Sequence, residues 1–219
     1  MRKYSSPYAA AGRANAAQRI DPNHPQRGEV EAFIAEVYRQ RFDTRLHHFL
    51  PHLLAFRDDD DRLRAAVGLR RADEGALFVE QYLDAPVEHE IGRALRREVE
   101  RRHVVEVGNF AARDAGDARR IIEHVTGVLH RADLRWVVLV ATRQLRNAFD
   151  RLQLSTSILA PAQRERLTDD GTDWGRYYDT GPQVVYGNVA AGQAFLSLRA
   201  TEASDDAPAV LPCPCLAMS

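Results

Sequence analysis

Cysteine is scarce in this chain of 219 residues. The two cysteines, Cys213 and Cys215, stand on either side of Pro214 near the end of the sequence. A disulfide framework is therefore excluded, and a reducing compartment is the simplest inference. A structural zinc site needs about four ligands, and there is no second cysteine pair to complete one with Cys213 and Cys215. We therefore expect no metal site.

Long apolar runs are missing as well. No stretch approaches the roughly 20 residues that a membrane-spanning helix requires, and Arg2 and Lys3 have no apolar segment behind them that would make a secretory signal. The formal net charge of -1 gives no overall attraction to nucleic acid or to anionic membranes. We expect a cytoplasmic protein that does not bind nucleic acid and that contacts membranes at most peripherally.

Large aliphatic residues are rare at both ends of the chain. Residues 1–27 are rich in Ala, Ser, Pro and Arg, and residues 200–219 are dominated by Ala, Asp and Pro. Segments of this kind cannot bury enough apolar surface to become ordered. We therefore expect a disordered N-terminal arm, a single domain at 28–199 and a disordered C-terminal tail, since the central part is long enough for one substantial core.

The central part alternates helical and extended patterns. Apolar residues three or four positions apart predict helices, and short apolar runs between turn residues predict strands. Helices are expected at 30–42, from Pro86 to Arg97, at 118–131 and at 144–152, and strands at 52–56, 63–70, 76–83, 103–112, 136–141 and 154–159. The strand–helix–strand unit at 103–141 requires a parallel pair, whereas the hairpin at 52–70 adds antiparallel strands. The predicted fold class is therefore a mixed α/β sheet with helices on both faces.

The strand around Glu106 carries the clearest chemical signal. This residue interrupts an apolar run, and an ionised carboxylate inside a sheet is costly unless it has a partner. Burial would raise its pKa toward neutrality, as a general base requires; alternatively, Glu106 faces solvent or pairs with Arg102. Asn109 belongs on the opposite face of a regular strand, but a bulge around Gly108 would bring it to the face of Glu106. Gly68, on the preceding hairpin, also marks a bulge or a close backbone approach.

A turn of small residues follows this strand. The pattern Arg113-x-x-Gly116-x-Ala118 would let the backbone approach a ligand closely, and the helix that starts here offers free N–H groups and a positive dipole to a pyrophosphate. An ordinary helix start, capped by Asp114 or Asp117, explains the same residues equally well.

Further polar and aromatic residues indicate a binding site. In an extended stretch, Glu80, Tyr82 and Asp84 would share one face and could hold an amine or guide a proton, or form the wet face of an edge strand. Trp174 would line an acyl pocket or belong to the core. No Gly-x-Ser-x-Gly elbow occurs and both cysteines lie in a tail, so direct attack by a bound acceptor fits better than a serine or cysteine nucleophile.

Three blocks of the sequence resemble the bacterial thermostable hemolysin family. They are Leu77–Asp84 with Pro86 and Glu88, Val105–Asn109, and Trp174–Tyr178, and the resemblance runs from about Phe33 to Val189. It implies a fold similar to the GNAT acyltransferases. The GNAT motif Gln/Arg-x-x-Gly-x-Gly/Ala, which binds the pyrophosphate or phosphopantetheine of the acyl carrier, maps onto Arg113, Gly116 and Ala118. We expect Phe110, Ala111 and Asn147 as further donor-binding residues.

A fainter similarity links the chain to the acyl-homoserine lactone synthases. Those enzymes have a Glu-x-x-Arg motif on the central strand, whereas Glu106 is followed here by Asn109 in the arginine position. The missing arginine tells against a homoserine-lactone product and leaves acyl transfer as a class open.

Together with the residues themselves, these resemblances imply an acyltransferase that moves an acyl group from acyl-CoA or an acyl carrier protein to a small amine acceptor. The donor is a co-substrate, and no permanently bound cofactor is expected. We expect Glu106 and Glu80 to be catalytic. The acceptor is expected to contact Tyr82, Asp84, Asn109 and Trp174. The alternative is a non-catalytic, membrane-active or interaction protein on the same fold.

Overall fold

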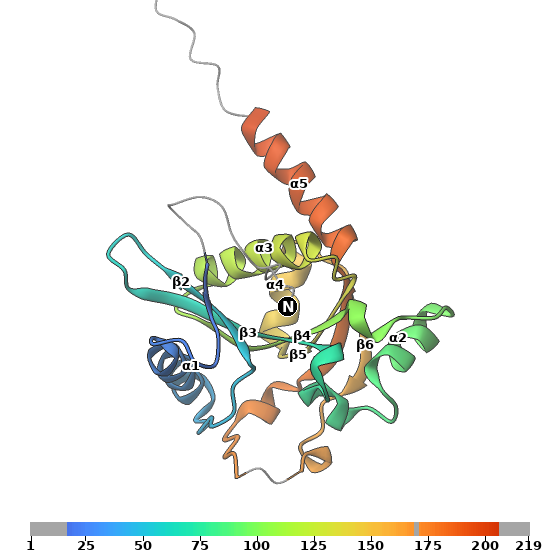
Figure 1. Cartoon of the computed structure of the whole chain (residues 1–219), viewed down its shortest axis with the longest axis horizontal. Helices are drawn as coiled ribbons and strands as arrows, with labels where there is room; N and C mark the ends of the chain where they lie inside the picture. The colour runs from blue at the N-terminus through green and yellow to red at the C-terminus, as the bar shows by residue number, and fades with distance from the viewer. Residues whose placement is uncertain (1–16, 169–170, 206–219) are drawn as a thin grey trace, which may run out of the picture.

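The structure, a computed structural model, describes residues 17–168 and 171–205. Its centre is a seven-stranded sheet in the order β1-β2-β3-β4-β5-β7-β6, with helices on both faces (Figure 1). The strands are β1 (Gln18–Ile20), β2 (His52–Arg57), β3 (Leu63–Arg71), β4 (Val104–Ala112), β5 (Trp136–Ala141), β6 (Thr156–Pro161) and β7 (Gln183–Asn188). The helices are α1 (Arg27–Phe42), α2 (Val87–Leu95), α3 (Ala115–Arg131), α4 (Arg143–Arg151) and α5 (Val189–Asp205), and the short 3-10 helix η2 spans Phe78–Tyr82.

β4 and β5 form the parallel pair that the strand–helix–strand pattern predicts, and α3 connects them. The other neighbouring strands of the sheet pair antiparallel. The expected GNAT-like α/β fold with a mixed sheet is confirmed. β5 also has the bounds expected from the sequence, because its apolar residues pack into cores on both faces of the sheet.

One face of the sheet is covered by α3 and α4, and the first turns of α5 pack beside α3. α3 begins after Asp114, whose carboxylate accepts the N–H of Asp117 at 2.8 Å and so caps the helix. Its apolar residues then recur every three or four positions, which directs them toward the sheet. The buried members of this stripe are Ile121, Ile122, Val125, Val128 and Leu129.

The opposite face carries α1, α2 and η2. In α1, Val30 and Ile34 are fully buried in a cluster with residues of β2, β3 and β4. In α2, Val87 and Ile91 are fully buried in a second cluster with residues of β4, β5 and η2. Each such aliphatic side chain stabilises the fold by roughly 1.5–3 kcal/mol relative to an exposed one. Both faces of the sheet therefore bury apolar clusters that stabilise the fold.

The stretch at 76–83 is not a strand, contrary to the sequence prediction. It contains η2, because the carboxylate of Glu106 on β4 accepts two N–H groups of this helix and Glu80 accepts another N–H at its start. The bonds to Glu106 come from a strand distant in the sequence, so the local pattern does not reveal them. Glu80, Tyr82 and Asp84 therefore do not share one face of a strand.

The ordered domain extends past both expected boundaries. β1 lies within residues 1–27 and is ordered because it pairs with β2 and buries Ile20. α5 continues to Asp205, beyond the expected boundary at 199. Residues 1–16 of the expected arm and residues 206–219 of the expected tail, with both cysteines, lie outside the described residues. Within the ranges that the structure describes, no helix is both long and apolar enough to cross a membrane.

Candidate active site

The parallel pair separates partway along β4 and β5. The two strands are paired at Val104–Glu106 and Trp136–Val138, and in the described structure no ladder joins them beyond these residues. β4 bends at Asn109, which has a φ of 49°, and the β3–β4 register shifts opposite it, between Ala66 and Gly68. This irregularity is a β-bulge. The bulge expected around Gly108 is therefore confirmed, and Glu106 and Asn109 line one cavity.

Asn109 and Gly68 hold the bulge in place. The Oδ1 atom of Asn109 accepts the N–H of Leu50 at 2.8 Å, and its Nδ2 donates to the carbonyl of His48 at 3.3 Å. A Cβ atom at Gly68 would lie 2.8 Å from Oδ1 of Asn109 and 2.9 Å from Cβ of Leu50, so only glycine fits without a shift. The expected close approach at Gly68 is confirmed, and Asn109 links β4 to the loop before β2.

The separated strands border a cleft of about 390 Å³ on the side of α3 and α4, called here the α3 cleft. Its wall contains Phe110, Gly116 and Ala118 of the predicted donor site, together with Arg119 and Arg151. The start of α3 opens onto this cleft, so the positive end of its dipole lies where the sequence pattern places a phosphate. The alternative of an ordinary helix start is also confirmed, since the carboxylate of Asp114 caps α3 and accepts the N–H of Asp117.

Three residues predicted to bind the donor have other surroundings. The Nε atom of Arg113 donates to the carbonyl of Leu63 at 2.9 Å, and its guanidinium lies over the ring of Phe33, 5.4 Å from the centroid. Ala111 is fully buried in the α1 cluster. Asn147 is exposed on α4 and is not part of the cleft wall as the structure describes it. The backbone turn is therefore present, whereas the Arg113 side chain is directed to α1.

A second cavity, of about 480 Å³, lies on the other face of the sheet beside η2 and is called here the η2 cavity. Glu106, Tyr82, Asn109 and Trp174 line it, so four of the predicted site residues are brought together. Residues around the separation of β4 and β5 belong to the walls of both spaces: Tyr38, Val107, Gly108, Val140 and Tyr177. The η2 cavity and the α3 cleft therefore meet through the opening in the sheet.

Glu106 is buried at this junction, with only 2% of its surface exposed. Its two carboxylate oxygens accept the N–H groups of Phe78 and Val79, each at 2.9 Å. Burial raises the pKa of Glu106 to about 7, because it penalises the charged form more than these hydrogen bonds and the charge of Arg70 favour it. The alternative of a pair with Arg102 is wrong, since Arg102 pairs with Glu100 at 2.6 Å.

Glu80 and Asp84 are placed differently from the expectation. Burial alone would raise the pKa of Glu80, but hydrogen bonds from Arg101 and from the N–H groups of Leu77 and Val87 outweigh it and lower the pKa to about 2. Asp84 is exposed and pairs with Arg166 at 2.8 Å. Neither carboxylate belongs to the wall of the η2 cavity in the described structure.

Arg70 is the residue of the η2 cavity that the sequence did not reveal. It lies opposite Glu106 in the antiparallel β3–β4 register, so both side chains project from the same face of the sheet. This pairing depends on the register shift at Gly68, which a single strand pattern does not show. Among the described residues, no group of three His, Cys, Asp or Glu side chains could hold a metal ion.

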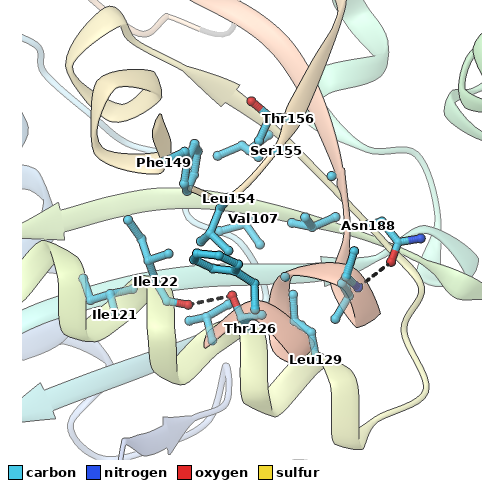
Figure 2. Close-up of a pocket in the computed structure, with 18 of the residues that line it drawn as sticks. Val107, Ile121, Ile122, Thr126, Leu129, Phe149, Leu154, Ser155, Thr156 and Asn188 are labelled. Atoms are coloured by element: carbon cyan, nitrogen blue, oxygen red, sulfur yellow. Dashed lines mark hydrogen bonds between the residues drawn. The ribbon is translucent and has the colours of Figure 1, made fainter. Parts of the chain in front are cut away.

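A third cavity, of about 300 Å³, continues from the α3 cleft beneath α5 and is called here the α5 cavity (Figure 2). It shares Val107, Phe110 and Leu139 with the cleft, and its walls are mostly aliphatic and aromatic. Two polar groups in its wall already have hydrogen-bond partners in the protein. The Thr126 hydroxyl donates to a carbonyl of α3 at 2.7 Å, and Oδ1 of Asn188 accepts an N–H of α5 at 2.8 Å (Figure 2). Such a space suits a hydrocarbon chain.

The comparisons with known proteins agree with this architecture. The family model described as thermostable hemolysin matches residues 20–193. Among solved structures, the AHL synthase LasI is 13% identical with a TM-score of 0.54, covering 81% of this chain and 91% of LasI. FeeM, an N-acyl amino acid synthase from uncultured soil microbes, is 15% identical with a TM-score of 0.54, covering 81% of this chain and 97% of FeeM.

A third similar structure was solved with two bound ligands. BjaI, a CoA-dependent acyl-homoserine lactone synthase solved with SAM and isopentyl-CoA, is 13% identical with a TM-score of 0.52, covering 85% of this chain and 89% of BjaI. At these identities the likeness shows the fold alone. Among curated proteins, no sequence matches this chain.

Proposed function

The chain belongs to the thermostable hemolysin family, and we propose that it is an acyltransferase that moves an acyl group from acyl-CoA or an acyl carrier protein to a small amine. The observation that carries this proposal is the passage through the sheet. It joins a cleft at the start of α3 to a cavity that contains a buried carboxylate with a pKa near neutrality. The similar structures of two acyl-homoserine lactone synthases and an N-acyl amino acid synthase support the same class of reaction.

The donor would occupy the α3 cleft and the α5 cavity. Its phosphates would lie at the first turn of α3, where Gly116 allows close approach and Arg119 and Arg151 stand in the wall. The pantetheine arm would hydrogen-bond the backbone of β4 and β5 beyond their last ladder pair. The acyl chain would continue into the α5 cavity, whose apolar walls exclude water from it. We infer a donor with an extended acyl chain rather than an acetyl group.

The reaction would take place at the opening in the sheet. The acceptor enters the η2 cavity as an ammonium ion, and Glu106 takes one proton from it, which a carboxylate with a pKa near 7 can do at neutral pH. The free amine attacks the thioester carbonyl, a C–N bond forms, and the C–S bond breaks. The thiol of the carrier leaves with the second proton of the amine, and no covalent enzyme intermediate is required.

Thiol release tests the proposal. The full chain is incubated with acyl-CoA donors of increasing chain length and a mixture of primary amines, and the free thiol is measured. We expect release with long-chain donors, strongly reduced in Glu106→Gln and unchanged in Glu165→Gln, a matched substitution at an exposed position. If no donor gives thiol release or a shift in thermal unfolding, acyl transfer is wrong and the non-catalytic alternative is favoured.

A further inference from the structure

Arg70 has an unusual position in the η2 cavity. It is the single arginine in the wall of this cavity among the residues that the structure describes. Its Nε atom is buried and has no hydrogen-bond partner, and in the described structure its guanidinium forms no ion pair within 4.0 Å. A guanidinium donor that loses water without gaining an acceptor costs free energy. Arg70 therefore has donors that a ligand in the cavity can satisfy.

A nearby arginine shows the contrast. Arg101 donates to Glu80 and Glu88, each at 2.6 Å, and also to the carbonyls of Ala72 and Gly75. Its donors are used within the fold, and the residue holds η2 and α2 together. Arg70 has no such set of acceptors, so a purely structural role does not account for its guanidinium.

The neighbour of Arg70 defines the ligand further. Arg70 and Glu106 are direct partners in the β3–β4 register, and the Cβ atoms of such partners lie about 4.5–5.5 Å apart. The carboxylate of Glu106 is held by the N–H groups of η2 rather than by Arg70. A cation and a carboxylate thus stand side by side at one cavity, without forming an ion pair with each other. A ligand that carries an ammonium and a carboxylate on neighbouring atoms would offer one charged group to each of these two side chains.

Most of the other residues in the cavity wall are apolar, and several of these are aromatic. Phe49, Phe78 and Trp174 line it together with Tyr38 and Tyr177. These rings line the same cavity as Arg70 and Glu106, and a volume of about 480 Å³ leaves room for a sizeable side chain. Aromatic walls favour an apolar or aromatic group through burial and ring contacts.

We propose that the acceptor is an α-amino acid with an apolar or aromatic side chain, and that Arg70 binds its carboxylate. This inference rests on the proposed acyl transfer and names the substrate class of that site. The ammonium of the amino acid lies against Glu106, which takes one proton. The amine attacks the thioester carbonyl, the C–N bond forms, the C–S bond breaks, and the thiol leaves with the second amine proton. The product is an N-acyl amino acid whose carboxylate is still bound by Arg70.

A pair of matched acceptors tests the proposal. L-Phenylalanine and 2-phenylethylamine have the same ring and amine and differ in the carboxylate. With a long-chain acyl-CoA donor, we expect kcat/KM for phenylalanine to exceed that for phenylethylamine by at least about tenfold, as a charge-assisted bidentate contact would give. Measured above the pH at which the rate has reached its maximum, Arg70→Gln should remove this preference mainly by raising KM for phenylalanine, with a much smaller change in kcat/KM for phenylethylamine. Arg70→Lys should restore part of the preference.

The outcomes separate the two proposals. Turnover of phenylethylamine equal to that of phenylalanine in the unsubstituted protein would overturn the amino acid assignment and leave acyl transfer intact. An equal loss with both acceptors in Arg70→Gln would show a structural role for Arg70 and would also overturn it. If no acceptor gives thiol release, acyl transfer fails. Calorimetric titration with phenylalanine alone then decides on the carboxylate site, which requires binding that Arg70→Gln abolishes.

Discussion

Glu106 and Glu80 hold the same short helix, η2, but in opposite electrostatic surroundings. Glu106 accepts two N–H groups of η2 and has no cation within 4.0 Å in the described structure. Glu80 accepts N–H groups at the starts of η2 and α2 and pairs with Arg101 at 2.6 Å. Burial raises the pKa of Glu106 to about 7, whereas the hydrogen bonds of Glu80 outweigh its burial and lower its pKa to about 2.

This difference separates a structural carboxylate from one that can exchange protons. A carboxylate that forms an ion pair with an arginine, as Glu80 does with Arg101, stays charged across the physiological pH range and contributes to stability. A buried carboxylate without a close cation changes its charge near neutral pH while it still accepts backbone hydrogen bonds. We therefore propose a structural role for Glu80 and retain proton transfer for Glu106. Substitutions of the two carboxylates, and of residues near Glu106, test this difference.

The largest expected effect comes from removing each carboxylate in turn. Glu106→Gln removes the base and should lower kcat/KM by about 10²–10⁴-fold, without lowering the thermal unfolding midpoint at neutral pH. Glu80→Gln should lower the thermal unfolding midpoint, because it breaks the ion pair with Arg101. The pH profile of the remaining activity should stay unchanged. Thiol-release kinetics and thermal unfolding of both variants measure this. A similar loss of activity in both variants, at similar stability, would contradict the distinction.

The two carboxylates should also give opposite dependences of stability on pH. The folded pKa of Glu106 lies above the ordinary value of 4.5, so the folded state binds more protons, and its contribution declines as pH rises from about 4.5 to 7. At roughly 1.4 kcal/mol per pKa unit the decline amounts to about 3 kcal/mol. The folded pKa of Glu80 lies below 4.5, so its contribution is complete above pH 4.5 and is lost as pH falls toward 2.

Urea unfolding at a series of pH values measures both slopes. Relative to the unsubstituted protein, Glu106→Gln should gain in free energy of unfolding between pH 5 and pH 8, because the substitution removes the buried charge. Glu80→Gln should be less stable at neutral pH, with the deficit disappearing in acid. A difference between Glu106→Gln and the unsubstituted protein that stays constant from pH 5 to pH 8 would show that Glu106 does not titrate in this range.

A change at the bulge perturbs the surroundings of Glu106 without touching those of Glu80. In Gly68→Ala, the new Cβ would lie 2.8 Å from Oδ1 of Asn109, so the link between β4 and the loop before β2 must shift. We expect a loss of about 1–3 kcal/mol in stability and a reduction in kcat/KM of about tenfold, since small misplacements at a reacting centre are costly. The control is Gly28→Ala, at a position where an added Cβ meets nothing within 4 Å; an equal effect in the control would contradict the account of the bulge.

The sequence predicted the elements whose patterns are local. The stripe of α3, its cap at Asp114 and the apolar run of β5 follow from short-range periodicity and capping. The parallel pair and the burial of Glu106 follow from them, because a strand between helices must be covered on both faces. The start of α3 at the cleft was predicted for the same reason. All of these are properties of one segment and its immediate neighbours.

The features that the sequence did not reveal depend on contacts between distant segments. The sequence predicted a strand where η2 lies. Two N–H groups of η2 donate to Glu106, which is 27 and 28 positions away in the sequence, so the local pattern could not show these bonds. Arg70 lies beside Glu106 because of the β3–β4 register, which the sequence did not show. Arg113 matched a motif, but a carbonyl of β3 and the ring of Phe33 on α1 hold its side chain. Small residues in α5 give it no clear apolar stripe, so the cavity beneath it was not foreseen either.

The smallest expected effect concerns Arg70, the neighbouring cation that forms no ion pair with Glu106 in the described structure. The positive charge of Arg70 favours the ionised carboxylate and so lowers the pKa of Glu106 from the higher value that burial alone would give. Arg70→Gln should therefore raise that pKa, and the pH at which the rate reaches half its maximum should rise by less than about one pH unit. With 2-phenylethylamine as acceptor, the measurement does not depend on carboxylate binding. Arg93→Gln, an exposed arginine on α2, serves as the control. A midpoint that stays fixed or falls in Arg70→Gln would mean that a group other than Glu106 controls the rate, because removing a cation beside the reacting carboxylate can only move its titration upward.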